Sequence, residues 1–334
     1  MAASAEGPQT LLLSRSDIVA LMRRPDYLNA VESGFRAAAQ GAASAPPPLS
    51  LEGSGGVFHA KAATLRLGRH YAALKFNGNF PDNPAGLPTI QGAILLCDAD
   101  NGVLLAVMDS IEVTLRRTAA ATALAARFLA RPESQTVLVC GCGAQGRAQL
   151  EALADIMPLR RCLAWDRDAG RANDFGRDLA DTLGLEITVA ASVGEAARES
   201  DVILACTTAQ QPYLELSQVR SGTFIAAVGA DSPFKNEVHP ELMSRALVVV
   251  DVLDQCLEMG DLRHAVHAGT MRPSQVHANL GELVTGEKAG RSSGDQITLF
   301  DSTGTALQDV AAAAAIYERA IRVDNSRWIA FGAT

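Results

Sequence analysis

A glycine-rich turn at Gly141, Gly143 and Gly146 constrains the fold of this chain more than any other feature. The turn directly follows the apolar run TVLVC and opens the helical segment AQGRAQLEALADI. In a G-x-G-x-x-G turn the first glycine permits a tight bend, the second lets a pyrophosphate approach the backbone, and the third lets helix and strand pack closely. The free N–H groups and partial positive charge of the helix N-terminus attract the same pyrophosphate. The sequence therefore predicts a strand, turn and helix that bind a dinucleotide.

The residue that would select the dinucleotide is Asp166, which lies about 20 residues beyond Gly146 at the end of the run RCLAW. A carboxylate there accepts hydrogen bonds from the adenosine ribose and repels a 2′-phosphate, which favours NAD over NADP. The neighbouring Arg167 leaves NADP open, because a guanidinium beside the ribose could pair with that phosphate. Arg167 could equally face solvent or stack on the adenine.

From residue 135 onward, short apolar runs alternate with helical segments such as 168–184 and 192–200. This alternation is typical of a doubly wound parallel sheet. The expected fold class is therefore α/β, a Rossmann sheet accompanied by a smaller α+β domain. The expected strands of the Rossmann sheet are TVLVCG, RCLAW, EITVA, DVILAC, TFIAAVGA and ALVVVD.

The first 130 residues have a different pattern. Residues 16–41 predict an amphipathic helix interrupted near Pro25, and residues 114–130 predict an alanine-rich helix. Residues 42–56 contain three consecutive prolines and are expected to form a loop. The expected strands cover 57–65, 70–77 and 89–110, the last of them a hairpin that turns at Asn101-Gly102.

Composition excludes several classes of function. Hydrophobic residues make up 48% of the chain and charged residues 20%, so a folded core is expected. The net charge is −8 and no Lys/Arg run exceeds a pair, whereas nucleic-acid binding needs a concentrated basic surface. No apolar run approaches the ~18 residues of a transmembrane helix, and the N-terminus lacks the pattern of a signal peptide. We expect a cytoplasmic protein whose partners are small molecules, not nucleic acid or membrane.

No metal site is expected. The six cysteines are sparse, and Cys140 and Cys142 have no second pair at zinc-site spacing. His264 and His267 have a metal-like spacing, but no acidic ligand pattern accompanies them, so surface histidines are the better interpretation.

Three charged residues are candidates for chemistry. Asp231 directly follows the expected strand TFIAAVGA, where a carboxylate could act as a general acid or base, or simply form a turn or cap a helix. Lys75 stands in an apolar strand and needs a partner, for which a substrate carboxylate is one candidate. Arg117 lies near the start of a helix and could hold a carboxylate through two hydrogen bonds.

Together these segments resemble the ornithine cyclodeaminase/μ-crystallin family over nearly the whole chain. The resemblance implies a Rossmann domain over 131–304 and a substrate-binding and dimerisation domain over 1–130, completed by a C-terminal helix over 305–334. It also implies a homodimer. The stretches that carry the resemblance are KFNGNFPDNPAGLPT, TLRRTAAATALAA, VCGCGAQGRAQ, VGADSPFKNE, GDL at residues 260–262, and FDSTGTALQDVAAA.

The resemblance also implies roles for individual residues. Lys75 and Arg117 would hold the substrate carboxylate, and Asp231 would be the catalytic acid/base, with Lys75 as the second catalytic candidate. The residues that would line the cofactor are Gly141, Gly143, Ala144, Gln145, Gly146, Asp166, Arg167, Thr89, Thr118, Thr207, Val228, Lys235 and Ser302.

The chain departs from the family pattern where the tail of the substrate would lie. Family members often carry an arginine shortly after a proline in the first loop, whereas this chain has only SAPPPLSLEG. A segment that usually resembles Met-Pro-Ala reads Lys61-Ala62-Ala63, so Lys61 is a candidate replacement for the missing arginine. His59 could face the substrate, or be a core or surface histidine.

The leading functional hypothesis is an NAD(P)-dependent oxidoreductase that interconverts an L-amino acid, or a cyclic amino acid, and its imine or 2-oxo acid. Hydride transfer at the α-carbon would need one cationic clamp and one carboxylate. The alternative is an ornithine- or lysine-type cyclodeaminase, which releases ammonia with no net redox change. A soluble binding protein with little turnover is a third hypothesis, and it would need Lys75, Arg117 or Asp231 to be dispensable.

Overall fold

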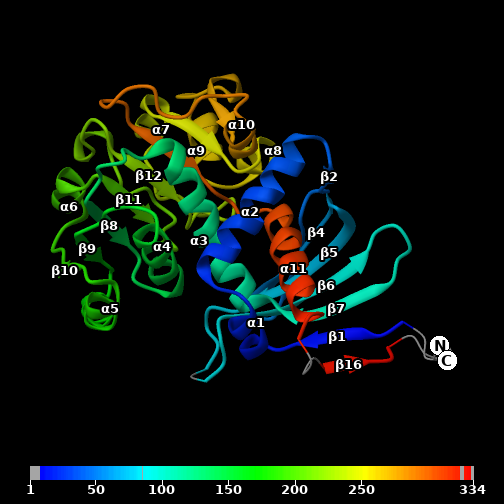
Figure 1. The fold of residues 1–334 in the computed structure, drawn as a ribbon. Coiled ribbons are helices and arrows are strands. Elements are labelled where there is room, and N and C mark those ends of the chain that lie inside the picture. The colour runs from blue at the N-terminus through cyan, green and yellow to red at the C-terminus, as the bar shows by residue number, and fades with distance from the viewer. Residues whose placement is uncertain (1–7, 85, 324–326, 332–334) are drawn as a thin grey trace. The chain divides into compact units, whose positions relative to one another are not determined.

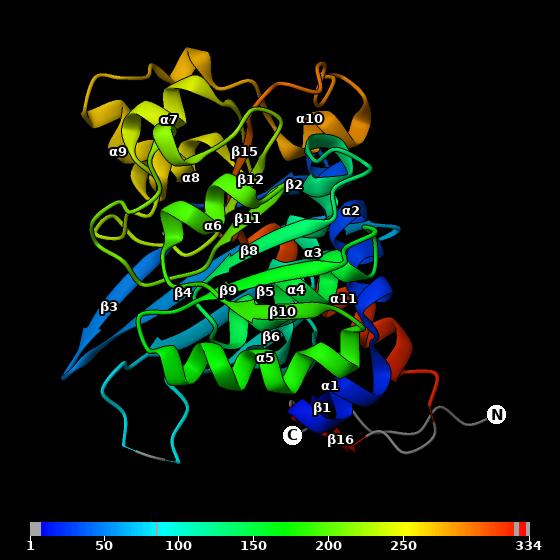
Figure 2. The same ribbon diagram turned by 90° about the vertical axis from the view of Figure 1, so that its left-hand side faces the viewer.

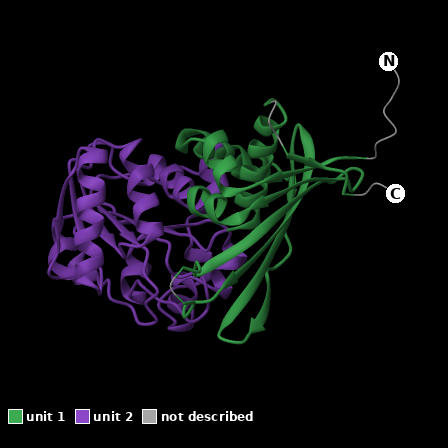
Figure 3. Ribbon diagram, turned by 90° about the horizontal axis from the view of Figure 1, so that it is seen from below, with its two compact units in different colours: residues 1–117, 305–334 green, residues 118–304 purple. Residues whose placement is uncertain are grey.

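The chain divides into two compact units. The computed structural model describes residues 8–84, 86–323 and 327–331. Unit 1 comprises residues 1–117 and 305–334, and unit 2 comprises residues 118–304 (Figure 3). The division falls inside helix α3 (Ser110–Leu129), so the first turns of this helix belong to unit 1 and the remainder to unit 2.

Unit 1 is built on one eight-stranded sheet (Figure 1). The strand order is β16-β1-β7-β6-β5-β4-β2, with β3 paired to β4. Neighbouring strands are antiparallel except for β1 and β7, which are parallel. The strands are β1 (Thr10–Leu13), β2 (Ala43–Ser44), β3 (Leu49–Gly53), β4 (Gly56–Leu67), β5 (Arg69–Asn79), β6 (Ile90–Asp98), β7 (Leu104–Asp109) and β16 (Arg327–Ile329).

Helices cover one face of this sheet, here called the inner face. The helices of unit 1 are α1 (Arg15–Leu21), α2 (Arg24–Ala39) and α11 (Ala306–Ala320), and α11 packs against α2, β4 and β5. Side chains alternate across a strand, so Ala73 and Lys75 of β5 are buried on the inner face, while Leu74 and Phe76 are exposed on the opposite, outer face. Helices α2 and α11 approach closely at Gly34, where an added Cβ would lie 2.8 Å from Cβ of Ala311.

Unit 2 contains a second eight-stranded sheet in which every pair of neighbouring strands is parallel. The strand order is β10-β9-β8-β11-β12-β15-β13-β14, and β10, β9, β8 and β11 run side by side in Figure 2. The strands are β8 (Thr136–Cys140), β9 (Arg161–Trp165), β10 (Glu186–Val189), β11 (Val202–Ala205), β12 (Phe224–Ala227), β13 (Leu247–Val250), β14 (Ala278–Asn279) and β15 (Thr298–Asp301).

Helices pack on both faces of the parallel sheet, as a doubly wound fold requires. In β8, Val139 faces α4 across Gly146, whereas Leu138 and Cys140 belong to a core that includes Val193 of α6. The helices of unit 2 are α4 (Ala144–Ala154), α5 (Ala169–Leu183), α6 (Val193–Glu199), α7 (Pro240–Arg245), α8 (Leu253–Glu258), α9 (Asp261–His267) and α10 (Leu280–Thr285).

The predicted α/β class is confirmed, and so are all six strands expected in the parallel sheet. Two strands were missed. β14 has only two residues, too few for a pattern of apolar residues. β15 has only four residues and lies just after the polar run RSSGDQ, so its apolar stretch was too short to predict a strand. The structure places β15 between β12 and β13, with every residue buried.

Predictions for unit 1 were right in most elements and wrong in two. The expected loop over 42–56 contains β2 and the strand β3, because Gly55 at a φ of +86° turns the chain back so that β3 pairs with β4. The helix expected over 305–334 ends at Ala320 and is followed by β16, while 324–326 and 332–334 lie outside the described residues. The expected hairpin is β6 and β7, and only Gly102 of its Asn-Gly pair has a positive φ.

No helix in the described ranges is both long enough and apolar enough to span a membrane.

Candidate functional site

The glycine-rich turn of unit 2 has a backbone that only glycine can adopt. Gly141 has a φ of +95°, and a Cβ there would lie 2.6 Å from the carbonyl oxygen of Cys206. A Cβ on Gly146 would lie 2.1 Å from the carbonyl oxygen of Gly141, so this glycine lets α4 pack against the turn. Both positions are therefore set by close backbone contacts, as the motif predicts.

Gly143 leaves the turn open instead. It is the N-cap of α4, it offers no side-chain cap, and a Cβ there would meet nothing within 4 Å. The first helical residues, Ala144 and Gln145, follow it. Uncapped N–H groups at a helix N-terminus beside open space suit a pyrophosphate.

Asp166 lies against this turn, where the sequence places an acceptor for ribose. One carboxylate oxygen, Oδ2, accepts a hydrogen bond of 2.8 Å from the N–H of Cys142, and Oδ1 accepts one of 3.0 Å from the N–H of Asp168. These bonds hold the carboxylate at the end of β9. Arg167 beside it is exposed.

A buried glutamate that the sequence analysis missed connects two further cofactor candidates. Glu237 accepts hydrogen bonds from the N–H and the hydroxyl of Thr207 at 2.6 and 2.7 Å, from the N–H of Gly229 at 2.8 Å and from the hydroxyl of Tyr213 at 2.8 Å. Burial is the largest influence on Glu237 and raises the pKa of its carboxyl. Glu237 thus fixes the segments that follow β11 and β12, the second of which includes Val228.

Ser302 is held by a second group of buried acids. Its hydroxyl donates to Asp251 Oδ2 at 3.3 Å, and the N–H of Gly304 donates to the same oxygen at 2.7 Å. Asp301 accepts from the N–H of Leu262 at 2.9 Å, and burial raises the pKa of its carboxyl. These carboxylates bond to backbone and hydroxyl groups, which explains how they are tolerated inside unit 2.

Asp231, the predicted acid/base, follows β12 and has a side chain that is 52% exposed. Its Oδ1 lies 2.6 Å from Nζ of Lys235, a predicted cofactor residue. The structure therefore brings these two predicted site residues together at the carboxyl end of the parallel sheet, the edge where such sheets bind ligands.

In unit 1, Lys75 and Arg117 converge on one carboxylate. Nζ of Lys75 lies 2.7 Å from Oδ2 of Asp309, and Nε of Arg117 donates to Oδ1 at 2.9 Å. Gln308 Oε1 accepts a further 2.7 Å bond from Arg117. All four side chains are buried. The sequence analysis missed Asp309 and Gln308, although an acid in the run TALQDVAAAAA is a signal that a buried partner is needed.

The charges of this group act on one another. Burial lowers the pKa of Lys75 to about 7, against the opposing pull of Asp309 and with the help of Arg117 and Lys61. Burial would raise the pKa of Asp309, but Arg117 and Lys75 outweigh it, so that pKa is lowered. Asp309 is therefore ionised at neutral pH, whereas Lys75 is poised between its two charge states.

The remaining predicted residues lie at varied depths. Lys61 faces Lys75 in the register of β4 and β5, and His59 bonds to Ser50 of β3 at 3.0 Å through Nδ1. Thr89 is exposed just before β6, and its carbonyl accepts from the N–H of Phe80. Thr118 is buried in α3.

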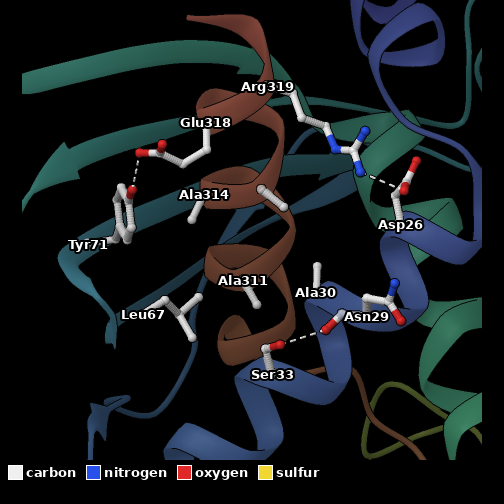
Figure 4. A pocket seen from close by; sticks show the side chains of 11 residues that line it. Asp26, Asn29, Ala30, Ser33, Leu67, Tyr71, Ala311, Ala314, Glu318 and Arg319 are labelled. Atoms are coloured by element: carbon white, nitrogen blue, oxygen red, sulfur yellow. Dashed lines mark hydrogen bonds and ion pairs between the residues drawn. The ribbon is translucent and has the colours of Figure 1, made fainter. Parts of the chain in front are cut away.

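A separate pocket of unit 1 does not contain the predicted residues. It has a volume of about 480 Å³ and lies between α2, α11 and the ends of β4 and β5 (Figure 4). The hydroxyl of Tyr71 donates to Glu318 at 2.6 Å, and Arg319 pairs with Asp26 at 2.6 Å. These four polar side chains of the pocket are thus engaged with one another. In the part of the chain that the structure describes, no cluster of three His, Cys, Asp or Glu residues could hold a metal.

The family resemblance can be tested directly. The model of the ornithine cyclodeaminase/mu-crystallin family matches residues 9–324. The chain belongs to this family.

Solved structures of other family proteins have the same fold. An archaeal alanine dehydrogenase dimer with bound NAD is 38% identical, with a TM-score of 0.92 over 97% of this chain and 100% of its own. The Δ(1)-pyrroline-2-carboxylate reductase of Thermococcus litoralis, in complex with NADH and L-proline, is 32% identical, with a TM-score of 0.90 over 94% and 98%. The iminosuccinate reductase of Paracoccus denitrificans, in complex with NAD+, is 29% identical, with a TM-score of 0.88 over 96% and 99%.

The buried Asp309 should be essential to the stability of unit 1. Asp309→Asn removes the charge shared by Lys75 and Arg117, and we expect it to cost about 3–5 kcal/mol of unfolding free energy, because two buried cations lose their partner. Asp100→Asn is the matched control, since Asp100 pairs with Arg66 and His70 in an exposed position and should change stability little. Chemical denaturation of both variants measures the difference. Equal effects would contradict the assigned importance of the buried group.

Proposed function

We propose that this chain is an NAD-dependent oxidoreductase that interconverts an L-amino acid, or a cyclic amino acid, and its imine or 2-oxo acid. The observation that carries the proposal is the convergence of Lys75 and Arg117 on one carboxylate. A substrate carboxylate presents the same pair of oxygens as Asp309, and arginine binds such a pair through its planar fork. Binding the carboxylate orients the α-carbon at which the reaction takes place.

The cofactor assignment is supported by the turn in unit 2 and by related proteins. The close contacts at Gly141 and Gly146, the open N-terminus of α4 and the carboxylate of Asp166 fit a dinucleotide with free ribose hydroxyls. The three solved relatives contain NAD, NADH or NAD+. When bound, NAD would accept a hydride from the α-carbon, leaving an imine.

Asp231 would handle the protons of this reaction. As the hydride leaves, the amino nitrogen loses a proton, and the carboxylate of Asp231, which follows β12, would accept it as a general base. Hydrolysis of the imine then adds water and releases ammonia and a 2-oxo acid. In the reverse direction the protonated Asp231 would return the proton to nitrogen.

Substitution of Asp231 tests its proposed role as the general base. We expect Asp231→Asn to lower kcat by roughly 10²- to 10⁴-fold while NAD still binds, because the general base is lost and the nucleotide turn is intact. NADH formation and ammonia release are followed together with NAD and a panel of L-amino acids. Asp174→Asn, on the exposed side of α5, is the control and should behave as the wild type.

The same assay distinguishes the alternatives. NADH with ammonia supports the dehydrogenase, and imine-dependent consumption of NADH supports the reductase direction. Ammonia without NADH from ornithine or lysine would instead establish the cyclodeaminase. Absence of turnover in both directions would contradict an enzymatic role.

The charge of Lys75 makes carboxylate binding depend on pH. Protonated Lys75 attracts the anion, and its pKa is lowered to about 7, so affinity should be full below pH 7 and fall by up to about tenfold per unit above it. The dissociation constant of a non-reacting carboxylate, measured from pH 6 to 9 with NAD present, tests this. Lys75→Arg keeps its charge throughout and should show a flatter profile. A flat wild-type profile would contradict the role of Lys75.

We also propose that the chain forms a homodimer through the outer face of the unit 1 sheet. Leu49, Leu51, Leu74, Phe76 and Leu95 of this face are each more than a third exposed, and exposed apolar surface of this extent marks an interface. An apolar groove of about 370 Å³ runs along the same face. The archaeal relative was solved as a dimer.

A charge on the outer face should therefore separate the subunits. Leu74 and Leu95 are register partners on β5 and β6, so Leu74→Glu places a charge at the centre of the proposed interface. Sedimentation should give the mass of two chains for the wild type and of one for the variant. Val19→Glu, in α1, where Val19 is 54% exposed against 38% for Leu74, should stay dimeric. A monomeric wild type would contradict the proposal.

A further inference from the structure

The segment that contains Asp231 and Lys235 has no regular structure of its own. Residues 228–237, all of them described, form neither a helix nor a strand after β12. The N–H of Asp231 donates to the carbonyl oxygen of Gly229 at 3.1 Å. The N–H of Lys235 donates to that of Ser232 at 3.3 Å. Short-range bonds of this kind do not fix the segment by themselves, so its position depends on the elements around it.

Helix α9 holds the segment from one side through two side chains. Nε2 of His264 lies 2.9 Å from the carbonyl oxygen of Lys235. A carbonyl oxygen only accepts, so the ring carries a hydrogen on Nε2 in this contact. Nη1 of Arg263 donates to the carbonyl oxygen of Pro233 at 3.2 Å. Both side chains are half-buried, which limits the competition of water for these bonds.

Helix α9 is itself fixed to the parallel sheet by buried groups. Asp301 at the end of β15 accepts from the N–H of Leu262 at 2.9 Å, and Leu262 is fully buried. Gly260 precedes the helix with a φ of +88°, and a Cβ there would lie 3.0 Å from both carboxylate oxygens of Asp301. Oδ1 of Asp261 accepts from the N–H of Glu237 at 2.7 Å, at the far end of the segment. The sheet therefore sets the position of the helix, and the helix supports the segment.

Lys235 connects His264 to Asp231. Its carbonyl oxygen accepts from His264, and its Nζ lies 2.6 Å from Oδ1 of Asp231. The side chain of Asp231 is 52% exposed, so its orientation depends on such neighbours. A misplacement of about 1 Å in a catalytic group can cost about 100-fold in rate. The contact made by His264 thus bears on the group that would accept the proton.

We propose that His264 is a positioning residue for the reaction, which through Lys235 orients the carboxylate of Asp231 toward the amino nitrogen of the substrate. The inference rests on the proposed function and adds to it a residue that acts through another. Of the two histidines with a metal-like spacing, only His264 has this role. His267 is exposed in the last turn of α9.

Substitution of His264 tests this role with NAD and the L-amino acid of the panel that gives the highest rate. We expect His264→Leu to lower kcat by roughly 10- to 100-fold and to change KM by less than about threefold, because Asp231 is misplaced while Lys75 and Arg117 are intact. His264→Gln has an N–H donor at a position similar to Nε2 and should recover most of the lost rate. His267→Leu is the matched control and should keep the wild-type kcat.

A double variant shows whether His264 acts through Asp231. In the Asp231→Asn background, His264→Leu should lower kcat by less than about twofold, because residues that act as a unit are not additive. An undiminished loss in that background would overturn the inference. So would a wild-type kcat in the single variant His264→Leu, or equal losses in His264→Leu and His264→Gln.

Hydrogen exchange separates this inference from the proposed function. His264→Leu should speed exchange of the backbone amides of Lys235 and Asn236 by about tenfold or more, and His267→Leu should not. Unchanged exchange would overturn the inference independently of catalysis. Faster exchange without turnover of any substrate would support the contact that positions the segment and would contradict the proposed function alone.

Discussion

The buried carboxylate of Asp309 is the interaction on which unit 1 depends. It binds Lys75 of β5 and Arg117 of α3, although 192 residues separate Asp309 from Arg117 in the chain. A buried charge is tolerated only with a partner, so each of the three residues requires the others. The same contact joins the last helix to the sheet and holds the two cations of the proposed carboxylate clamp. Stability and the proposed substrate binding would thus rest on one set of atoms.

A buried carboxylate also holds segments together in unit 2, where its partners are N–H and hydroxyl groups and not cations. Glu237 fastens the segments after β11 and β12 by accepting hydrogen bonds from Thr207 and Gly229. These segments lie at the edge of the sheet where parallel strands present ligand-binding groups. Charged acceptors bind N–H groups strongly, which keeps loops without regular structure in a defined position.

The two faces of β5 serve different purposes because side chains alternate along a strand. Lys75 and Asn77 face the helices, and Leu74 and Phe76 face outward, where Phe76 stacks on Phe58 with ring centroids 5.2 Å apart. A shift of one residue in register would exchange the two sets. The same strand therefore holds Lys75 of the proposed binding site on one face and the apolar surface of the proposed subunit interface on the other.

Sequence reasoning reached the nucleotide turn because its glycines and Asp166 are close together in the chain and serve one local geometry. All six strands expected in the parallel sheet are present, because each is a short apolar run that can be recognised from neighbouring residues alone. Sequence reasoning missed β3, because the turn at Gly55 was interpreted as part of a loop, and it found Lys75 and Arg117 without their partner. The sequence by itself determined the fold class and the family, and it named the residues of the candidate site. Only the tertiary structure decided that Asp309 joins the two cations and that Glu237 ties two strand ends, because these contacts depend on how segments distant in the chain pack together.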